Sequence, residues 1–353
     1  MKIAFFGSSL LSSYWNGAAT YYRGIIKALH TRGHAVTFYE PDAYERQSHR
    51  DIQPPEWAES IVYSPSEDAL GPLLKHARSA DLIIKASGVG VLDGFLEAAV
   101  PALRTPENAV VFWDVDAPAT LERLAGDPAD PFRELIPRFD AILTYGGGEP
   151  VVTAYASLGA RCCVPIYNGL DPETHHPAPA DERFAADLAF LGNRLPDRES
   201  RVEEFFLRAA ENVPESSFLL AGSGWEDKPA PPNVRRLGHV GTADHNAFNR
   251  SARLVLNVSR SSMARFGFSP ATRVFEAAGA GACLVTDSWQ GIGTFFEPGR
   301  EILVADGAQD VADFVANTPQ TEAVEIGRRA RQRALGEHTY AHRADQFERV
   351  FAS

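Results

Sequence analysis

The stretch from Ser259 to Asp287, SRSSMARFGFSPATRVFEAAGAGACLVTD, predicts a strand end, a loop, a helix and a second strand. Ser269 is expected to cap the helix, because a serine hydroxyl accepts a hydrogen bond from a free N–H group of the first turn. Pro270 follows at the first helical position, where its missing N–H has no cost. The helix is expected to end within residues 279–281, at one of the glycines there. The apolar run 282–287 predicts the next strand.

The start of this helix is a candidate phosphate site. Free N–H groups and the helix dipole both attract an anion there. Arg273 and Glu276 lie three residues apart, so their side chains project over neighbouring surface. Arginine suits phosphate oxygens and a carboxylate suits ribose hydroxyls, so the pattern predicts a site for a nucleoside diphosphate. The alternative is an ordinary packing helix that carries the two residues as a surface ion pair.

The block SPATRVFEAAGAGACLVTD, followed by WQGIGTFFEPGREILV, resembles the signature of group 1 (GT4-like) glycosyltransferases, and among them the CgeB-type, or spore maturation protein, branch. The resemblance implies a GT-B fold, in which two Rossmann-like, doubly wound α/β domains enclose a cleft and the C-terminal domain holds the donor. The wider family usually carries two glutamates separated by seven residues. Glu276 matches the second of them, whereas Phe268 stands at the first position. The sugar contact of that first glutamate is therefore absent or made by another residue.

Composition limits the classes of partner. The chain has 353 residues, which suits two domains of ordinary size, and a formal net charge of −12. The negative charge argues against nucleic acid or an anionic membrane surface as the main partner. The three cysteines, Cys162, Cys163 and Cys283, match no metal or redox spacing and are expected to be reduced and buried. No apolar run is long enough to span a bilayer, so a cytoplasmic location is expected.

Strand-like and helix-like segments alternate twice along the chain. KIAFFG, a helix ending at Gly33 and HAVTFYE form a first βαβ unit, and the second half repeats the pattern from ADLAFLG onward. We expect an N-terminal acceptor-side domain at 1–170, a C-terminal donor-binding domain at 171–335, and a helix at 336–353 that crosses back to the first domain. The connection Asn-Gly-Leu-Asp at 168–171 resembles the interdomain connection of group 1 glycosyltransferases.

A second cluster of candidate residues follows the strand ADLAFLG. The strand is expected to end at Gly192, and Arg194 and Arg198 lie in the turn before the next helix. In the family that this chain resembles, the turn supplies cations to the donor diphosphate, and the arginine fork meets phosphate oxygens in pairs. The alternative is a solvated charge run, because acidic residues are interspersed.

Two further strand ends point to the same site. Asn257 and Arg260 follow an apolar strand, and Arg260 is expected to face the diphosphate. His239 ends another strand at the position where the family reads the base, mainly through its backbone. A half-buried histidine without a ligand is the equal alternative for His239.

The first half offers acceptor-side candidates. Asp114 and Asp116 follow the strand AVVFW at its carboxyl end, where open α/β sheets bind ligands. The pair resembles the DxD metal motif of the GT-A fold, but the phosphate arginines make a metal unnecessary. We therefore expect Asp116 to act as a general base or to orient a hydroxyl; a helix cap is the alternative. Asn16 and Gly17 lie in the loop after the first strand. This loop is expected either to contact a substrate or to be a plain connection.

The leading function is transfer of a hexose from a UDP-, GDP- or dTDP-type donor to an unidentified acceptor, without metal or cofactor. A nucleotide-sugar epimerase of the same fold and a non-catalytic nucleotide-sugar-binding protein are the alternatives. An NAD-linked oxidoreductase fits worst, because neither half has a GxGxxG turn with a downstream acid. A homodimer is left open.

Overall fold

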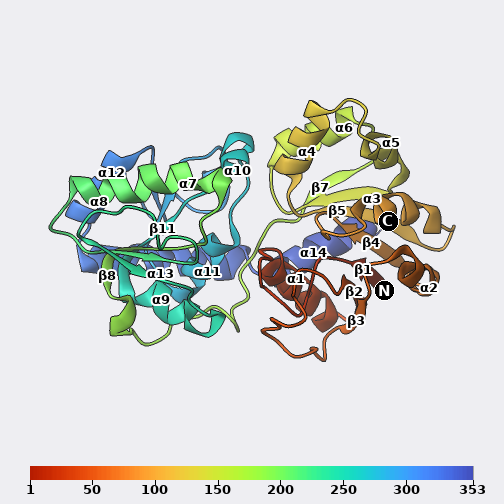
Figure 1. The fold of residues 1–353 in the computed structure, drawn as a ribbon, viewed down its shortest axis with the longest axis horizontal. Helices are drawn as coiled ribbons and strands as arrows, with labels where there is room; N and C mark the ends of the chain where they lie inside the picture. The colour runs from red at the N-terminus through yellow and green to blue at the C-terminus, as the bar shows by residue number, and fades with distance from the viewer. Residues whose placement is uncertain (353) are drawn as a thin grey trace. The chain divides into compact units, whose positions relative to one another are not determined.

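The computed structural model describes residues 1–352 and divides into two compact units (Figure 1). Unit 1 comprises Met1–Tyr167 together with the C-terminal segment from Tyr340, and unit 2 comprises Asn168–Thr339. Unit 1 is therefore discontinuous in sequence, and unit 2 is inserted into it. The observed divisions lie after residues 167 and 339, where the sequence analysis expected them after 170 and 335.

Unit 1 is built on a seven-stranded parallel sheet. The spatial order of its strands is β3-β2-β1-β4-β5-β6-β7, and β1 pairs with both β2 and β4. Phe5 marks the centre, since it lies opposite Phe38 of β2 and Ile84 of β4. The strands are β1 Lys2–Phe6, β2 Ala35–Pro41, β3 Glu59–Tyr63, β4 Leu82–Ala86, β5 Ala109–Asp114, β6 Ala141–Thr144 and β7 Cys163–Pro165.

Helices connect most of these strands, as is usual in a parallel sheet, whereas residues 42–58 join β2 to β3 without a helix. Helix α1 ends at Thr31, and Gly33 at φ +88° turns the chain into β2. The helices of unit 1 are α1 Ala19–Thr31, α2 Glu67–Ala77, α3 Asp93–Ala99, α4 Ala117–Gly126, α5 Phe132–Leu135, α6 Gly148–Ser157 and α14 Tyr340–Phe351, with short 3₁₀ turns at Pro101–Leu103 and Ile136–Arg138.

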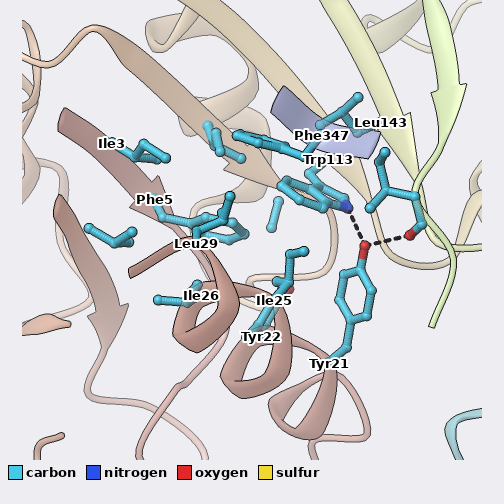
Figure 2. Close-up of a cluster of buried hydrophobic side chains, with 14 of the residues drawn as sticks. Ile3, Phe5, Tyr21, Tyr22, Ile25, Ile26, Leu29, Trp113, Leu143 and Phe347 are labelled. Atoms are coloured by element: carbon cyan, nitrogen blue, oxygen red, sulfur yellow. Dashed lines mark hydrogen bonds between the residues drawn. The ribbon is translucent and has the colours of Figure 1, made fainter. Parts of the chain in front are cut away.

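Helix α14 packs in the aromatic core of unit 1 together with β1, β5 and α1 (Figure 2). Phe347 of α14 stacks on Trp113 of β5 with ring centroids 5.6 Å apart. The indole Nε1 of Trp113 donates to the hydroxyl of Tyr21 at 3.0 Å, and that hydroxyl donates to the carbonyl of Ile166 at 2.6 Å. Gly24 of α1 leaves room for Tyr340, whose ring would lie 2.1 Å from an added Cβ. The last helix is therefore part of the core of the first unit.

Unit 2 repeats the architecture with six parallel strands in the order β10-β9-β8-β11-β12-β13. Its strands are β8 Ala186–Leu191, β9 Phe218–Ala221, β10 Val234–Leu237, β11 Ala252–Asn257, β12 Leu284–Asp287 and β13 Leu303–Ala305. Its helices are α7 Pro196–Val202, α8 Arg208–Asn212, α9 His245–Ser251, α10 Ser261–Phe266, α11 Thr272–Ala280, α12 Ala308–Asn317 and α13 Gln320–Glu337, with 3₁₀ turns at Glu182–Phe184, Thr242–Asp244 and Ile292–Thr294.

Helices cover both faces of the sheet of unit 2. In Figure 1, α7, α8 and α12 lie on one face, and α9, α11 and α13 lie on the other. A π-helical segment, Glu203–Leu207, joins α7 to α8, so residues 196–212 form one helical stretch. The sequence predicted a helix here but not the π segment, which the apolar pattern does not reveal.

Both units are Rossmann-like doubly wound α/β domains, which confirms the fold class predicted from the sequence. Within residues 1–352 no helix combines the length and the apolar character that crossing a bilayer demands. All three cysteines are free thiols; Cys283 is buried, but Cys162 and Cys163 are only half-buried, contrary to expectation.

Candidate functional site

The candidate donor site of unit 2 lies at the point where the strand order reverses. β8 is the centre from which the chain moves outward to β9 on one side and to β11 on the other. Ligands of doubly wound folds bind outside the carboxyl ends of the two strands at such a point. The loops in question are 192–195 after β8 and 258–260 after β11, which carry Gly192, Arg194 and Arg260 of the residues selected from the sequence.

Glycine at position 192 leaves space for the side chain of Arg198 in the turn after β8. An added Cβ on Gly192 would lie 2.8 Å from Nη2 of Arg198 and 3.0 Å from the ring of Phe190. The carbonyl of Gly192 accepts a hydrogen bond from Nε1 of Trp225 at 2.7 Å. Gly192 therefore allows Arg198 to fold back against the end of the strand.

Arg198, Arg260 and Arg273 form an arginine cluster at this strand edge. Arg198 lies in the first turn of α7, and its Nη2 donates to the carbonyl of Asn193 at 2.6 Å. Burial, followed by the charges of Arg273 and Arg260, lowers the pKa of Arg198 to about 10, although Asp197 opposes the shift. Arg260 also donates through Nε to Asp197. The positive charges of Arg198, Arg260 and Arg273 therefore lie close enough to repel one another, and Asp197 and Glu276 offset them only in part.

Two nitrogens of this cluster are buried without a hydrogen-bond partner: Nε of Arg198 and Nη1 of Arg273. Burial lowers the pKa of Arg273, and only the charge of Glu276 counters it. A buried guanidinium without a partner has a high desolvation cost. The arrangement is therefore suited to an anion with several acceptor oxygens.

The start of α11 differs from the prediction. The helix begins at Thr272 with Ala271 as N-cap, and no side chain caps its N–H groups. The prediction that Ser269 is the cap and Pro270 the first helical residue is wrong, because the hydroxyl of Ser269 donates to the carbonyl of Gly267 at 2.9 Å instead. The predicted end is confirmed: Gly281 has φ +75° at the C-cap. An uncapped N-terminus leaves its N–H groups to a ligand.

The loop before α11 is fixed from two sides. The backbone N–H of Phe268, at φ +45°, donates to the carbonyl of Gln290 at 2.6 Å. Nδ2 of Asn168 donates to the carbonyl of Pro270 at 3.0 Å, and the hydroxyl of Thr272 donates to Oδ1 of Asn168 at 3.4 Å. Asn168 belongs to the Asn-Gly-Leu-Asp segment, but the sequence analysis did not select it as a site residue.

Glu276 lies among two histidines that the sequence analysis also missed. Glu276 is 7% exposed, and Oε1 lies 3.8 Å from Nε2 of His175. Burial raises the pKa of Glu276, but His175, Arg273 and His245 together outweigh it, so the pKa lies below its ordinary value. Glu276 is therefore a carboxylate at neutral pH.

His175, His245 and Glu276 also have ligand atoms close enough together to hold a metal ion, all within 4.8 Å of one another. Within residues 1–352 they are the one such group. Two imidazoles and a carboxylate are ligands that zinc accepts. Arg273 places a competing positive charge beside the same carboxylate. His175 is distant in sequence from His245 and Glu276, so no local spacing could have revealed the cluster.

Two predicted donor residues, Arg194 and Asn257, have other contacts in the structure, and a third, His239, is exposed. Arg194 donates to Glu199 at 2.7 Å and to Asp227 at 3.0 Å, which neutralises its charge at the surface. Asn257 is buried and donates through Nδ2 to the hydroxyl of Thr286 at 3.0 Å, so it ties β11 to β12. His239 is exposed, two residues beyond β10.

In unit 1 the two aspartates at the carboxyl end of β5 have different environments. Asp114 is fully buried and accepts hydrogen bonds from Tyr155 at 2.5 Å, Ser87 at 2.7 Å, and Thr120 and the backbone N–H of Asp116 at 3.1 Å. Burial raises its pKa above the ordinary value. These bonds occupy the carboxylate, so Asp114 anchors the start of α4 rather than a ligand.

Asp116 occupies the N-cap position of α4 but makes no side-chain cap hydrogen bond. Its side chain is half-buried at the carboxyl end of β5. The alternative interpretation of Asp116 as a helix cap is therefore wrong.

The loop after β1 is held by buried polar groups. Asn16 donates to the carbonyls of Ser9 and Ser12 and accepts from the hydroxyl of Ser8, so it braces the loop. Gly17 is exposed, and no atom lies within 4 Å of an added Cβ. Glu40, at 0% exposure, accepts from the backbone N–H of Leu10 at 2.5 Å. The sequence analysis missed Glu40, because its neighbours in sequence are those of an ordinary strand.

Residues 198–349 match the family model described as glycosyl transferase-like. This part of the chain, less than half of it, is similar to glycosyl transferase-like domains. The match begins at Arg198 and includes Arg260, Arg273 and Glu276, whereas the turn at Gly192 lies before it. No curated protein sequence matches the chain.

Solved structures with a GT-B fold resemble the whole chain. HepE of Anabaena in complex with UDP and glucose has a TM-score of 0.68 at 17% identity, over 100% of both chains. Sucrose-phosphate synthase from Thermosynechococcus elongatus has a TM-score of 0.70 at 13% identity, over 100% of this chain and 98% of that one. The T4 phage BGT in complex with UDP-glucose has a TM-score of 0.62 at 12% identity, over 99% of both.

Proposed function

We propose that this protein is a glycosyltransferase that moves a hexose from a nucleoside diphosphate donor to an acceptor hydroxyl. The observation that carries the proposal is the arginine cluster beside the uncapped start of α11, with buried nitrogens of Arg198 and Arg273 that have no partner. A diphosphate supplies the acceptor oxygens that these groups lack. The similarity of residues 198–349 to the glycosyl transferase-like family model supports the choice of reaction.

Each residue of the proposed donor site has a distinct part. Arg198, Arg273 and Arg260 bind the diphosphate, together with the N–H groups at the start of α11. Glu276, ionised and held beside His175, accepts hydrogen bonds from the ribose hydroxyls. Phosphate contacts from Arg194, expected from the sequence, are left out of this proposal because two carboxylates, Glu199 and Asp227, pair with it.

UDP is the donor nucleotide that we propose, because HepE and the T4 phage BGT were solved with UDP or UDP-glucose. The acceptor side of the reaction belongs to unit 1, where Asp116 is proposed to take the proton of the acceptor hydroxyl. The Asp116 carboxylate does not cap its own helix. The CgeB-type branch, the cytoplasmic location and a homodimer stay predictions.

The proposal is tested by UDP binding to arginine variants. Arg198→Gln and Arg273→Gln should each weaken UDP about tenfold to hundredfold, the value of one charge-assisted hydrogen bond of about 1.5–3 kcal/mol. Arg208→Gln is the matched control, since Arg208 lies on the same helical stretch and pairs at the surface with Glu204. Titration calorimetry measures the affinities. Unchanged affinity in both variants, or an equal loss in the control, would contradict the diphosphate site.

Transfer is proposed to be independent of metal, because arginines take the part that a cation plays on the phosphates. UDP-glucose hydrolysis should therefore survive EDTA. If chelation abolished hydrolysis, zinc restored it and His175→Ala reproduced the loss, the His175–His245–Glu276 set would be a metal site and this part of the proposal would fail.

A further inference from the structure

The strand order of unit 1 also reverses, at β1, and a hollow lies beside that point. The loops after β1, β2 and β4 line a hollow of about 440 Å³. Its lining residues are Trp15, Tyr44, Glu45, Arg46 and Gly90. None of them belongs to the donor site, which lies in unit 2.

Two aromatic rings of the hollow face solvent. Trp15 is 60% exposed and Tyr44 is 55% exposed, the highest values among the large apolar side chains in residues 1–352. Single exposed apolar side chains are common on protein surfaces, whereas exposed apolar side chains that lie together mark binding sites. Trp15 and Tyr44 line the same hollow, so they are an exposed aromatic pair and not two isolated side chains.

The rings are held in place by unusual backbone. Trp15 has φ +48°, Tyr44 φ +56° and Glu45 φ +57°. Bulky residues adopt such angles rarely and at a cost in backbone strain, and residues of this kind gather at binding sites. The hydroxyl of Tyr44 donates to the carbonyl of Gly90 at 2.6 Å, and an added Cβ on Gly90 would lie 2.7 Å from the Tyr44 ring. The orientation of the Tyr44 ring is therefore fixed before any ligand arrives.

Polar groups of both kinds adjoin the rings. Arg46 is 7% exposed, its guanidinium lies 5.1 Å from the centre of the Tyr44 ring, and its Nε is buried without a partner. Glu45 is exposed and offers carboxylate oxygens. The hollow thus presents a hydrogen-bond donor, an acceptor and two apolar ring faces.

We propose that this hollow binds a pyranose ring of the acceptor, stacked on Trp15 and Tyr44; the inference rests on the proposed function. One face of a pyranose carries C–H groups, which pack on the electron-rich face of an aromatic ring. Its hydroxyls both donate and accept, which matches Glu45 and Arg46. A flat aromatic alcohol would use the rings but leave the polar pair largely unused, and the exposed carboxylate of Glu45 disfavours an anionic ligand.

The test measures sugar binding to the full chain with UDP present at saturation, so that the donor site is filled. Methyl β-glucoside, methyl β-galactoside, maltose and cellobiose are the sugar probes, 2-naphthol is the aromatic probe, and saturation-transfer NMR is the readout. At least one sugar should receive saturation mainly on the C–H protons of one face. Trp15→Leu should weaken that binding at least tenfold, and Trp15→Phe should retain most of it. Val324→Ala, at another exposed apolar residue, should change nothing.

Three results would overturn the inference: no sugar probe binds, Trp15→Leu binds as well as the wild type, or only 2-naphthol depends on Trp15. UDP binding and UDP-glucose hydrolysis without acceptor are measured on the same samples. If those fail while Trp15-dependent sugar binding persists, the proposed reaction is wrong and the sugar site stands. If they succeed in Trp15→Leu and sugar binding is unaffected, the proposed reaction stands and this inference fails.

Discussion

At the scale of single residues, the buried charges of this protein have two different fates. Asp114 and Glu40 are buried carboxylates whose oxygens accept hydrogen bonds from their own unit. Arg198 and Arg273 retain nitrogens without a partner. A buried polar group that folding leaves unsatisfied lowers stability, and sites of function are where such costs persist. This contrast separates the structural charges from the proposed ligand-binding ones.

Asp116 is the residue on which the chemistry of transfer can be tested. Asp116→Asn should lower kcat about a hundredfold to ten-thousandfold, the usual contribution of a general base, and leave UDP affinity unchanged. Asp127→Asn, at the other end of α4, is the control. Near-normal turnover in Asp116→Asn would mean that the base lies elsewhere, as in a retaining mechanism that uses the phosphate of the donor.

His245 should make stability depend on pH. Burial, aided by Arg273 and His175 and opposed by Glu276, lowers the pKa of His245 to about 4, below the ordinary 6.5. The unfolded chain then binds the proton first, so the folded state loses stability as the pH falls from about 6.5 towards 4. In melting curves, His245→Gln should lose less over this window than the wild type. The exposed His239→Gln is the control; a difference between wild type and His245→Gln that stays constant with pH would contradict the assignment.

At the scale of elements, most strands of both sheets could be predicted because they are short apolar runs bounded by glycine or charge; β10, Val-Arg-Arg-Leu, is an exception. The end of α11 could be predicted as well, since Gly281 provides the left-handed cap that a helix end favours. Its beginning could not, because the hydroxyl of Ser269 bonds backward to Gly267 and the loop is held by the distant Asn168. α10 was missed because its six residues are too few to show a helical period.

The cap of α11 gives a test of this element. Gly281→Ala forces an alanine to φ +75°, which costs about 1–2 kcal/mol, while its Cβ meets only Arg331 at 4.0 Å. For a domain of this size the melting temperature should fall by about 2–8 °C. Gly293→Ala is the matched control, since its added Cβ meets nothing within 4 Å and its φ lies outside the strained range. Equal melting temperatures for the two variants would show that the cap does not limit stability.

At the scale of the whole molecule, the two-domain α/β class was predicted from the alternation of elements, and the sites were predicted only in part. The donor-site candidates lie after a strand or in the first turns of a helix, where doubly wound folds bind ligands. The positions of Arg198, Arg260, Arg273 and Glu276 could therefore be inferred. His175, Glu40 and the rings of Trp15 and Tyr44 could not, because the partners that define their surroundings are distant in sequence. Arg194 was selected by position, but its pairing depends on Asp227 in another loop.

Phe347 tests the coupling of the C-terminal helix to unit 1. Phe347→Ala removes a ring that stacks on Trp113 in the core, which should cost about 3–5 kcal/mol of folding free energy. UDP affinity should be unchanged, because the donor site lies in unit 2. Arg349→Ala, at an exposed position of the same helix, is the control. If Phe347→Ala lost UDP affinity at a temperature where the variant is folded, the assignment of the donor site to unit 2 alone would be contradicted.

The return of α14 to unit 1 also has a consequence for biosynthesis. The ribosome makes the chain from its first residue onward, and domains generally fold as units during synthesis. The core around Trp113 and Tyr21 lacks Phe347 until residue 347 has been added, by which time all of the inserted unit 2 has been translated. The unit that starts first is therefore completed last, and its apolar sheet face stays incomplete throughout elongation. A premature stop codon shortly before residue 340 would release a polypeptide with every strand present and that face uncovered, a ready target for chaperones and proteases.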